Sequence, residues 1–183
     1  MNEPARALLR DLLSYQPADA TETQAYTTIV RFLESETQPF SRQTLQRHIT
    51  ASAFLVDETY ERLLFVWHRK LQKWLQPGGH IETADASVYD AAAREALEET
   101  GHDTRASIIS NAIFDVDVHA IPARADDPAH EHLDIRYLMV VGEKVGRADH
   151  ELRWLRVADV DGTETDAATV RAVRKLHRLL ERR

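Results

Sequence analysis

One predicted helix, residues 86–100, constrains the fold of this chain more than any other feature. The segment is rich in Ala, Leu and Glu, which favour helices, and Gly101 follows where a left-handed residue commonly ends a helix. Asp85 or Ser87 could cap its first turn. Just upstream, Pro77-Gly78-Gly79 predicts an irregular turn between two extended pieces. A strong helix that follows strands and a glycine turn predicts a fold of mixed helices and strands.

Three glutamates lie on one face of this helix. Glu95, Glu98 and Glu99 occupy positions i, i+3 and i+4, so their Cβ atoms are expected about 5–6 Å apart. Such like charges repel each other, and the helix dipole disfavours anions near a C-terminus. A bound cation would remove both penalties, and oxygen ligands suit Mg²⁺ or Mn²⁺. Arg94 could orient a carboxylate through a forked hydrogen bond, although three glutamates alone would also fit a solvated acidic face.

With its glycine turn included, the segment resembles the signature of the Nudix hydrolase family. That signature is a glycine, five residues, a glutamate, seven residues, Arg-Glu, an apolar residue, any residue, Glu-Glu, any residue, a glycine and a final apolar residue. The matching positions here are Gly79, Arg94, Glu95, Ala96, Glu98, Glu99 and Gly101. The residues from Trp74 to His80 also resemble the lead-in that is common in this family.

The segment departs from the family pattern in three places. Asp85 stands where the pattern has its first glutamate, eight residues instead of seven separate it from Arg94, and His102 takes the final apolar position. An extra residue inside a helix would rotate everything after it by about 100°. We therefore expect the extra residue in the loop at positions 83–87, which leaves the Arg94–Glu99 face intact.

The resemblance implies a fold, a cofactor and an activity. The implied fold is the family's α/β/α sandwich with a mixed sheet over residues 45–183, and residues 1–44 form an N-terminal helical extension outside it. The implied cofactor is Mg²⁺ or Mn²⁺. The implied metal ligands are Glu95, Glu98, Glu99 and the Gly79 carbonyl. The implied activity is hydrolysis of a diphosphate linkage, by water attack at phosphorus, in a nucleoside diphosphate-linked or related small phosphorylated substrate.

The remaining segments predict the other elements of such a fold. Apolar residues at helical spacing indicate helices, and short β-rich runs indicate strands. Helices are expected at 4–14, 22–35 with Thr21 as cap, and 166–182. Strands are expected at 48–56, 62–68, 106–119, 134–142 and 151–157, with a hairpin at Asp57-Glu58 and a loop from Pro122 to Glu131. Strands with helices on either side predict a sheet covered on both faces.

The two N-terminal helices carry apolar stripes that need a surface to bury them. The stripes are Leu8, Leu9, Leu12 and Leu13 on the first helix and Tyr26, Ile29, Val30 and Phe32 on the second. We expect them to pack on the catalytic domain or on a second subunit, as in a homodimer.

Composition and charge limit the partners of the chain. Hydrophobic residues make up 43% of the 183 residues and there is no cysteine, so we expect a sizeable core and no thiolate chemistry. The net charge of −7 disfavours long nucleic acid, whereas a small phosphorylated substrate could bind through a divalent cation. No apolar run approaches the ~20 residues that span a bilayer, and the charged N-terminus is a poor signal peptide. We expect a cytoplasmic protein without membrane attachment.

Several carboxylates could accept the proton of an attacking water. Glu95 and Glu98 are candidates on the helix, with Arg94 beside them as part of the catalytic group. In similar enzymes the base can come from a later loop, which here points to Glu151 or Glu131. Glu151 lies three residues before Trp154, where relatives often carry an acid, and an exposed position at a strand edge is the alternative.

Residues outside the helix are candidates for substrate contacts. The candidates are His80, Trp74, His132 and Arg136, with Trp67, His68 and Lys70 as further stacking or phosphate partners. A core position is the alternative for the tryptophans. The segment that contains His119, His130, His132 and Asp134 is rich in titratable groups. Its histidines would fit the surface, a substrate contact or, because imidazole suits Zn²⁺, a transition-metal site.

Two other functions would fit the same fold. One is a catalytically inactive Nudix-like module that binds a nucleotide or regulates a partner, but binding alone would not need three clustered glutamates. The other is an isomerase of isoprenyl diphosphates, an activity associated with a cysteine that this chain lacks. The sequence does not distinguish nucleoside triphosphates, nucleotide sugars, ADP-ribose, dinucleoside polyphosphates and non-nucleotide diphosphates as substrates.

Overall fold

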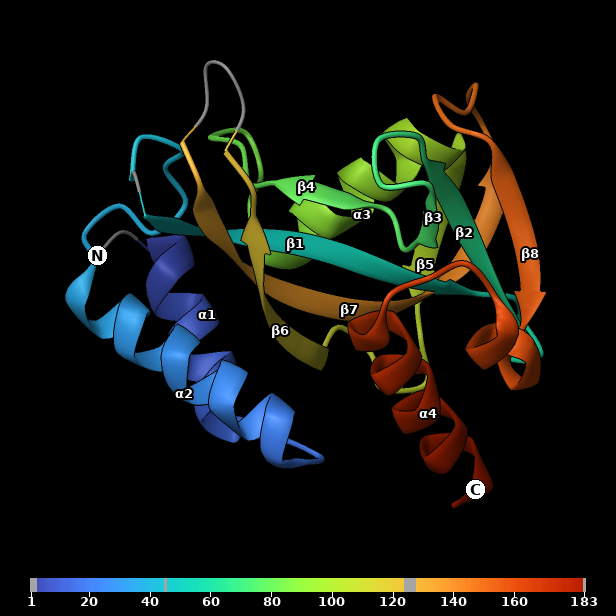
Figure 1. The fold of residues 1–183 in the computed structure, drawn as a ribbon, viewed down its shortest axis with the longest axis horizontal. Coiled ribbons are helices and arrows are strands. Elements are labelled where there is room, and N and C mark those ends of the chain that lie inside the picture. Colours follow the sequence, from blue (N-terminus) through green and yellow to red (C-terminus); the bar gives the residue numbers. More distant parts are fainter. Residues whose placement is uncertain (1–2, 45, 124–127, 183) are drawn as a thin grey trace. The chain divides into compact units, whose positions relative to one another are not determined.

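The computed structural model describes residues 3–44, 46–123 and 128–182. The helices are α1 (Glu3–Ser14), α2 (Ala20–Ser35), α3 (Val88–Thr100), α4 (Ala167–Glu181) and the 3₁₀ helix η1 (Val157–Gly162). The strands are β1 (Arg47–Val56), β2 (Arg62–His68), β3 (Lys73–Leu75), β4 (Gly78–His80), β5 (His102–Ala106), β6 (Ile113–Ile121), β7 (His130–Lys144) and β8 (Leu152–Arg156). They pair in the order β3-β2-β1-β7-β5, with β4 on β1, β6 on β7 and β8 on β2 (Figure 1). This mixed sheet with flanking helices confirms the predicted α/β class.

The chain divides into two compact units. One contains Met1–Ser52, Gly79–Ala92 and Ala112–Tyr137, and the other contains Ala53–Gly78, Ala93–Asn111 and Leu138–Arg183. Strands β1 and β7 and helix α3 contribute residues to both units. The N-terminal helices share a unit with β6, so the division of the chain after residue 44 stays a prediction.

In the first unit, the N-terminal helices pack on strand β6. Helix α2 contacts both α1 and β6, and the two helices lie side by side in Figure 1. The predicted apolar stripes supply much of this packing, because Leu8, Leu12 and Ile29 are buried. Leu13 was assigned to the same stripe but is 67% exposed. The expectation that these helices find a surface within the chain is therefore met, and a homodimer stays a prediction.

In the second unit, β2 lies between β3 and β1 in the sheet. It pairs antiparallel with β1, β3 and β8, and its residues Leu63, Leu64 and Phe65 are buried, as the apolar run predicts. The C-terminal helix α4 packs against η1. It begins after Asp166, whose carboxylate accepts a hydrogen bond from the Thr169 amide (2.7 Å), a common helix cap.

Three local features differ from the sequence-based expectation. The strand predicted at 106–119 starts later, as β6 at Ile113, after a turn in which Ser110 has a φ of +55°, and β5, which ends at Ala106, was not predicted. Strand β7 begins at His130, inside the predicted loop 122–131, of which residues 124–127 lie outside the described residues. Helix α2 is capped by Asp19 and not by Thr21, because the Asp19 carboxylate accepts the Glu22 amide.

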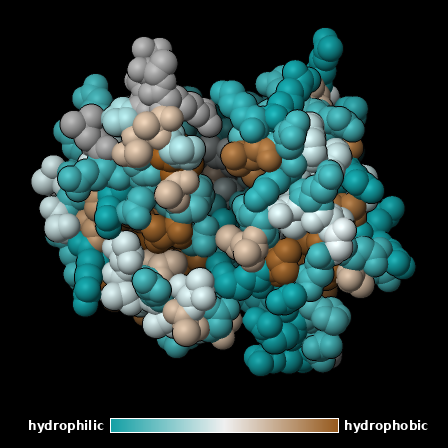
Figure 2. All heavy atoms as spheres, in the orientation of Figure 1, coloured by the Kyte–Doolittle hydropathy of each residue, from teal (hydrophilic) through white to brown (hydrophobic). Residues whose placement is uncertain are grey.

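The face of the molecule drawn in Figure 2 is mainly polar. Figure 2 shows a face on which hydrophilic residues dominate and hydrophobic patches are small and separate. Among the described residues, none of the helices has the length and apolar character that crossing a bilayer requires.

Candidate active site

Helix α3 begins with a capped first turn, and the extra residue between Asp85 and Arg94 lies in the loop before the helix. Ser87 Oγ accepts the Asp90 amide (3.1 Å) and donates to the Asp90 carboxylate (2.7 Å), so Ser87 is the cap. The Asp85 carboxylate instead accepts the Glu82 amide (2.7 Å) and closes a turn. Because α3 runs without interruption from Val88 to Thr100, the extra residue lies outside the helix. The structure thus places Asp85 in a turn-forming position.

The three glutamates and Arg94 form the carboxylate face, which belongs to the second unit. Arg94 Nη1 donates to Glu95 Oε1 (3.1 Å) and to Glu98 Oε2 (3.2 Å), so one nitrogen bridges two carboxylates. The side chains of Glu95 and Glu99 are 15% and 21% exposed, whereas that of Glu98 is 53% exposed. The face therefore combines two shielded carboxylates with one that is open to solvent.

Glu99 carries a strongly perturbed carboxyl on this face. Burial raises its pKa to about 8, with the charges of Glu95, Asp149 and Glu98 adding to the effect and a hydrogen bond from the Gly78 amide opposing it. A carboxyl with such a pKa lies where negative charge is insufficiently compensated. A cation at this position would relieve that excess.

The turn after α3 brings a second loop against the glutamates. Gly101 has a φ of +72°, and its carbonyl accepts the Gly146 amide (2.9 Å). Farther along the loop, the Asp149 amide donates to the Glu99 carbonyl (3.2 Å), and His150 Nε2 lies 3.8 Å from Glu99 Oε1. Asp149 and His150 were not predicted as site residues. Their position next to Glu151 is the one feature of the sequence that indicates them.

The two later candidates for the general base lie in different units. Glu151 is exposed just before β8, in the unit of the carboxylate face, and its carbonyl accepts the Trp67 amide (2.9 Å). Glu131 lies on β7 in the first unit and forms an ion pair with Arg47 (2.8 Å). Glu151 is consequently the candidate that follows directly on the loop against Glu99.

Trp74 occupies a core position and not an open stacking surface. It is 6% exposed, its ring centroid lies 5.1 Å from that of Trp67, and the Arg153 guanidinium lies 5.6 Å from its centroid. A substrate ring cannot stack on a face that the protein already covers. Trp74 therefore has the alternative role of a core residue, and the prediction that it contacts substrate does not fit its position.

Arg136 is likewise structural. It is 1% exposed, and its guanidinium donates to Asp134 (2.8 Å), Asp117 (3.0 Å) and Asp115 (3.3 Å). Burial lowers the pKa of Arg136, but the three carboxylates outweigh burial and raise it above its ordinary value. The residue stays charged and neutralises buried aspartates, so the predicted contact with substrate does not fit its position.

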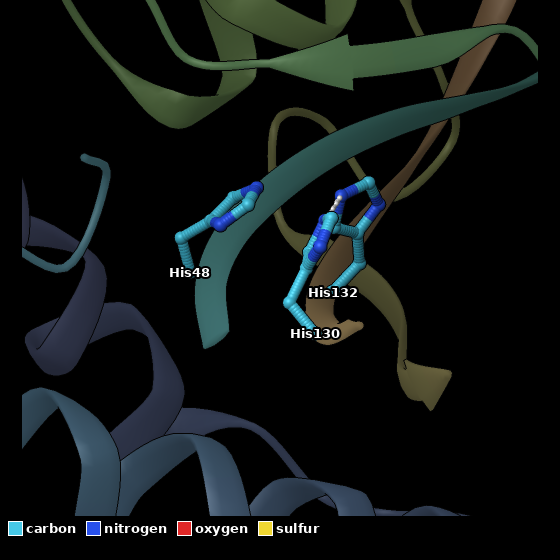
Figure 3. A group of neighbouring side chains, drawn as sticks. All are labelled: His48, His130 and His132. Atoms are coloured by element: carbon cyan, nitrogen blue, oxygen red, sulfur yellow. Dashed lines mark hydrogen bonds between the residues drawn. The ribbon is translucent and has the colours of Figure 1, made fainter. Parts of the chain in front are cut away.

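Histidines gather in the first unit. They are His48, His80, His119, His130 and His132. The ring centroid of His48 lies 4.8–5.1 Å from those of His80, His130 and His132, and Figure 3 shows three of these side chains together. Burial, with the charges of the neighbouring histidines, lowers the pKa of His132 to about 2. The structure thus joins His80 and His132, both predicted substrate contacts, and adds His48, which the sequence analysis did not single out.

The family is decided by a match that extends well beyond the α3 segment. The family model of the NUDIX domain matches residues 46–176, more than half of the chain. The chain belongs to the Nudix family. It is a Nudix pyrophosphohydrolase, as the resemblance of the α3 segment predicts.

Solved structures of Nudix hydrolases support this assignment. A NUDIX-family hydrolase from Clostridium perfringens is 26% identical, with a TM-score of 0.51 over 74% of this chain and 99% of its own. A MutT NUDIX hydrolase from Burkholderia pseudomallei is 22% identical, with a TM-score of 0.55 over 71% and 98%. A UDP-X diphosphatase is 12% identical, with a TM-score of 0.52 over 95% and 90%. The last two similarities show the fold alone. None of the curated proteins matches the chain significantly.

Nudix enzymes generally use a divalent metal, and the donors of the carboxylate face fit one. All side-chain donors of this face are carboxylate oxygens, which Mg²⁺ and Mn²⁺ prefer. The raised pKa of Glu99, caused first by burial and then by the neighbouring carboxylates, means that its charged form is disfavoured without a cation. Both observations favour a cation on the carboxylate face.

Proposed function

We propose that this Nudix protein hydrolyses a diphosphate linkage in a nucleoside diphosphate-linked or related small substrate, with Mg²⁺ or Mn²⁺ as cofactor. The observation that carries the proposal is the carboxylate face of α3 inside the family match. Glu95, Glu98 and Glu99 would hold the metal, and the Gly79 carbonyl as a further ligand stays a prediction from the family resemblance. When bound, the metal would lower the pKa of a water ligand and neutralise charge on the phosphate oxygens.

The residues of the chain would orient the groups and accept the proton. Arg94 holds Glu95 and Glu98 at a fixed separation through its shared Nη1. The base must be an ionised carboxylate that can reach a water near phosphorus. Glu98 and Glu151 are both exposed and suit this role, whereas Glu95 is mostly shielded. The pH profiles of kcat for Glu98→Gln and Glu151→Gln would separate them, because loss of the base removes the acidic limb.

The similarity to a UDP-X diphosphatase shows the fold alone, and a nucleoside diphosphate linked to a second group is the substrate class that we would test first. That similarity covers 95% of this chain, so about nine of its 183 residues (5%) are left out. Nine residues are far fewer than the 44 of the N-terminal segment, which means that the similarity includes most of this segment. We propose that residues 1–44 are an integral extension of the Nudix domain at 45–183. A homodimer stays a prediction.

The first testable prediction is that activity depends on a metal and on the diphosphate. A panel of nucleotide sugars, ADP-ribose, dinucleoside polyphosphates and nucleoside triphosphates should be incubated with the full chain and Mg²⁺. Phosphatase-coupled detection reports monophosphate products, and pyrophosphatase-coupled detection reports released diphosphate. We expect turnover of at least one diphosphate-linked substrate and its loss after chelation, with recovery on adding Mg²⁺ or Mn²⁺. Full activity after exhaustive chelation would rule out the metal mechanism.

A further inference from the structure

We propose that His48, His130 and His132 form a binding site for a transition-metal ion such as Zn²⁺. The site belongs to the first unit, whereas the carboxylate face belongs to the second. Each of the three side chains offers one imidazole nitrogen, and these nitrogens all lie within 4.8 Å of one another. Figure 3 shows the His130 and His132 rings, both from β7, meeting at their nitrogens beside the His48 ring from β1.

The separation of the first two nitrogens matches metal coordination. His130 Nε2 and His132 Nε2 are 3.2 Å apart. Two ligands of a tetrahedral Zn²⁺ at about 2.0–2.1 Å from the metal lie about 3.3 Å from each other. In the metal-free protein the same two nitrogens share a proton. On metal binding, His132 would take its other neutral tautomer, with the proton moved from Nε2 to Nδ1.

Hydrogen bonds to the Nδ1 atoms of the histidines determine which rings can bind a metal through Nε2. His130 Nδ1 lies 2.9 Å from the Pro128 carbonyl, to which only a protonated nitrogen can donate, so the neutral ring has its lone pair on Nε2. His80 is held differently, because the Arg42 guanidinium donates to its Nδ1. A neutral His80 therefore carries its proton on Nε2 and is unsuited to be a ligand through that atom. With His48, His130 and His132 as the ligands, a fourth position is left for water or an anion.

His48 completes the site by a rotation of its ring. The His48 ring is buried and stacks on the His130 ring with an interplanar angle of 26°. Its nitrogen lies within 4.8 Å of the other two, and a turn of the ring about its soft χ2 torsion would bring it to the tetrahedral separation. The imidazole donors distinguish this site from the carboxylate face. Nitrogen ligands suit Zn²⁺, Co²⁺ and Ni²⁺, whereas oxygen ligands suit Mg²⁺.

The test uses Co²⁺ as a visible probe of the full chain after chelator treatment and dialysis. Excess Mg²⁺ is present throughout so that it competes for carboxylate sites. We expect about one equivalent of Co²⁺ to bind, with the strong visible absorption of a four-coordinate ion, and Zn²⁺ to displace it. His130→Gln and His132→Gln should each weaken binding by at least about 100-fold, since loss of a second-shell partner alone costs 10–100-fold.

Two control variants distinguish binding at this site from binding at a surface histidine or at the carboxylate face. His177→Gln removes an exposed histidine on α4, and Glu99→Gln removes a carboxylate of the face on α3. Both should leave the Co²⁺ spectrum and affinity nearly unchanged, although Glu99→Gln should lose hydrolysis. Circular dichroism and thermal melting would show that the histidine variants are folded. Absence of the Co²⁺ band, binding retained in both histidine variants, or binding lost in Glu99→Gln would each overturn the proposal.

Discussion

At the scale of single residues, Glu99 combines burial with unfavourable charge on the carboxylate face. Its carboxyl lies beside other carboxylates and is mostly removed from water, which is unfavourable unless a cation is bound. The second prediction is that Glu99→Gln lowers kcat/KM by about 10²–10⁴, because a few kcal/mol of charge stabilisation is lost. Steady-state kinetics at limiting Mg²⁺ would measure the change.

The matched control for this prediction is Glu143→Gln. Glu143 is exposed on β7 in the same unit, and the substitution makes the same chemical change outside the carboxylate face. It should alter kcat/KM little. Near-normal turnover of Glu99→Gln would mean that the face is not catalytic, and a nucleotide-binding role without hydrolysis would then describe the protein better.

The third prediction concerns the pH dependence of stability in the metal-free protein. The pKa of Glu99 is about 8 in the folded chain and 4.5 in the reference state, so the folded state binds this proton more tightly. The contribution of Glu99 to stability is therefore present at low pH and is lost as pH rises between these values. The melting temperature of Glu99→Gln should rise relative to the parent protein over that window. An equal difference at pH values below and above the window would contradict the assigned cause.

Residues differ in how much of their role the sequence could predict. The spacing of Glu95, Glu98 and Glu99 predicts their common face, because a helix alone determines it. The cluster around Arg136 required the register of two strands, in which Asp115 pairs with Arg136. His48 was not singled out because it lies at the start of an apolar strand. Its partners are at least 82 positions away along β7, counting from His48 to His130.

At the scale of elements, Gly101 ends helix α3 and packs against the loop that carries Asp149 and His150. A Cβ at this position would lie 2.5 Å from the Gly146 carbonyl oxygen, and the φ of +72° is costly for any other residue. The fourth prediction is that Gly101→Ala destabilises the protein by at least about 1–2 kcal/mol and lowers kcat/KM by displacing the loop beside Glu99.

Gly162→Ala is the matched control for Gly101→Ala. A Cβ at Gly162 meets nothing within 4 Å, and this glycine has an ordinary φ. Its effect should stay within about 0.5 kcal/mol. Denaturant unfolding and kinetics of the two variants would test the pair, and similar stabilities would show that the close approach of Gly101 and Gly146 is not needed.

Elements with a strong local pattern were predicted well, and those defined by tertiary pairing were not. Helices α2, α3 and α4 and strands β1, β2 and β8 lie within about two residues of the predicted bounds, because periodicity specifies them. The segment 106–119 reads as one strand, since its apolar residues hide the turn at Ser110. Strand β5 begins immediately after the helix cap and is specified by pairing with β7, which the sequence does not display.

At the scale of the whole molecule, the N-terminal extension raises the question of whether it stabilises the Nudix domain. Helix α2 packs on β6, a strand inside the family match, and Tyr15 donates a hydrogen bond to the Phe114 carbonyl (3.4 Å). Removing residues 1–40 would uncover the apolar surface of β6. A chain that begins at Ser41 should therefore aggregate or melt at a lower temperature. A stable, monodisperse and fully active product would show that the extension is dispensable.

Adjacent leucines on α1 allow a sharper fifth prediction in the full chain. Leu12 is fully buried and Leu13 is 67% exposed, so truncating each to alanine makes the same chemical change at a buried and at an exposed position of one helix. Leu12→Ala should cost about 2–5 kcal/mol, because it removes buried methyl groups and leaves a cavity, whereas Leu13→Ala should stay within about 0.5 kcal/mol. Denaturant unfolding would measure both. If α1 is an integral part of the cooperative unit, Leu12→Ala lowers the stability measured in the single unfolding transition that also abolishes activity. Equal stabilities of the two variants, or a separate early transition for α1 that leaves activity unchanged, would mean that the extension folds apart from the enzyme.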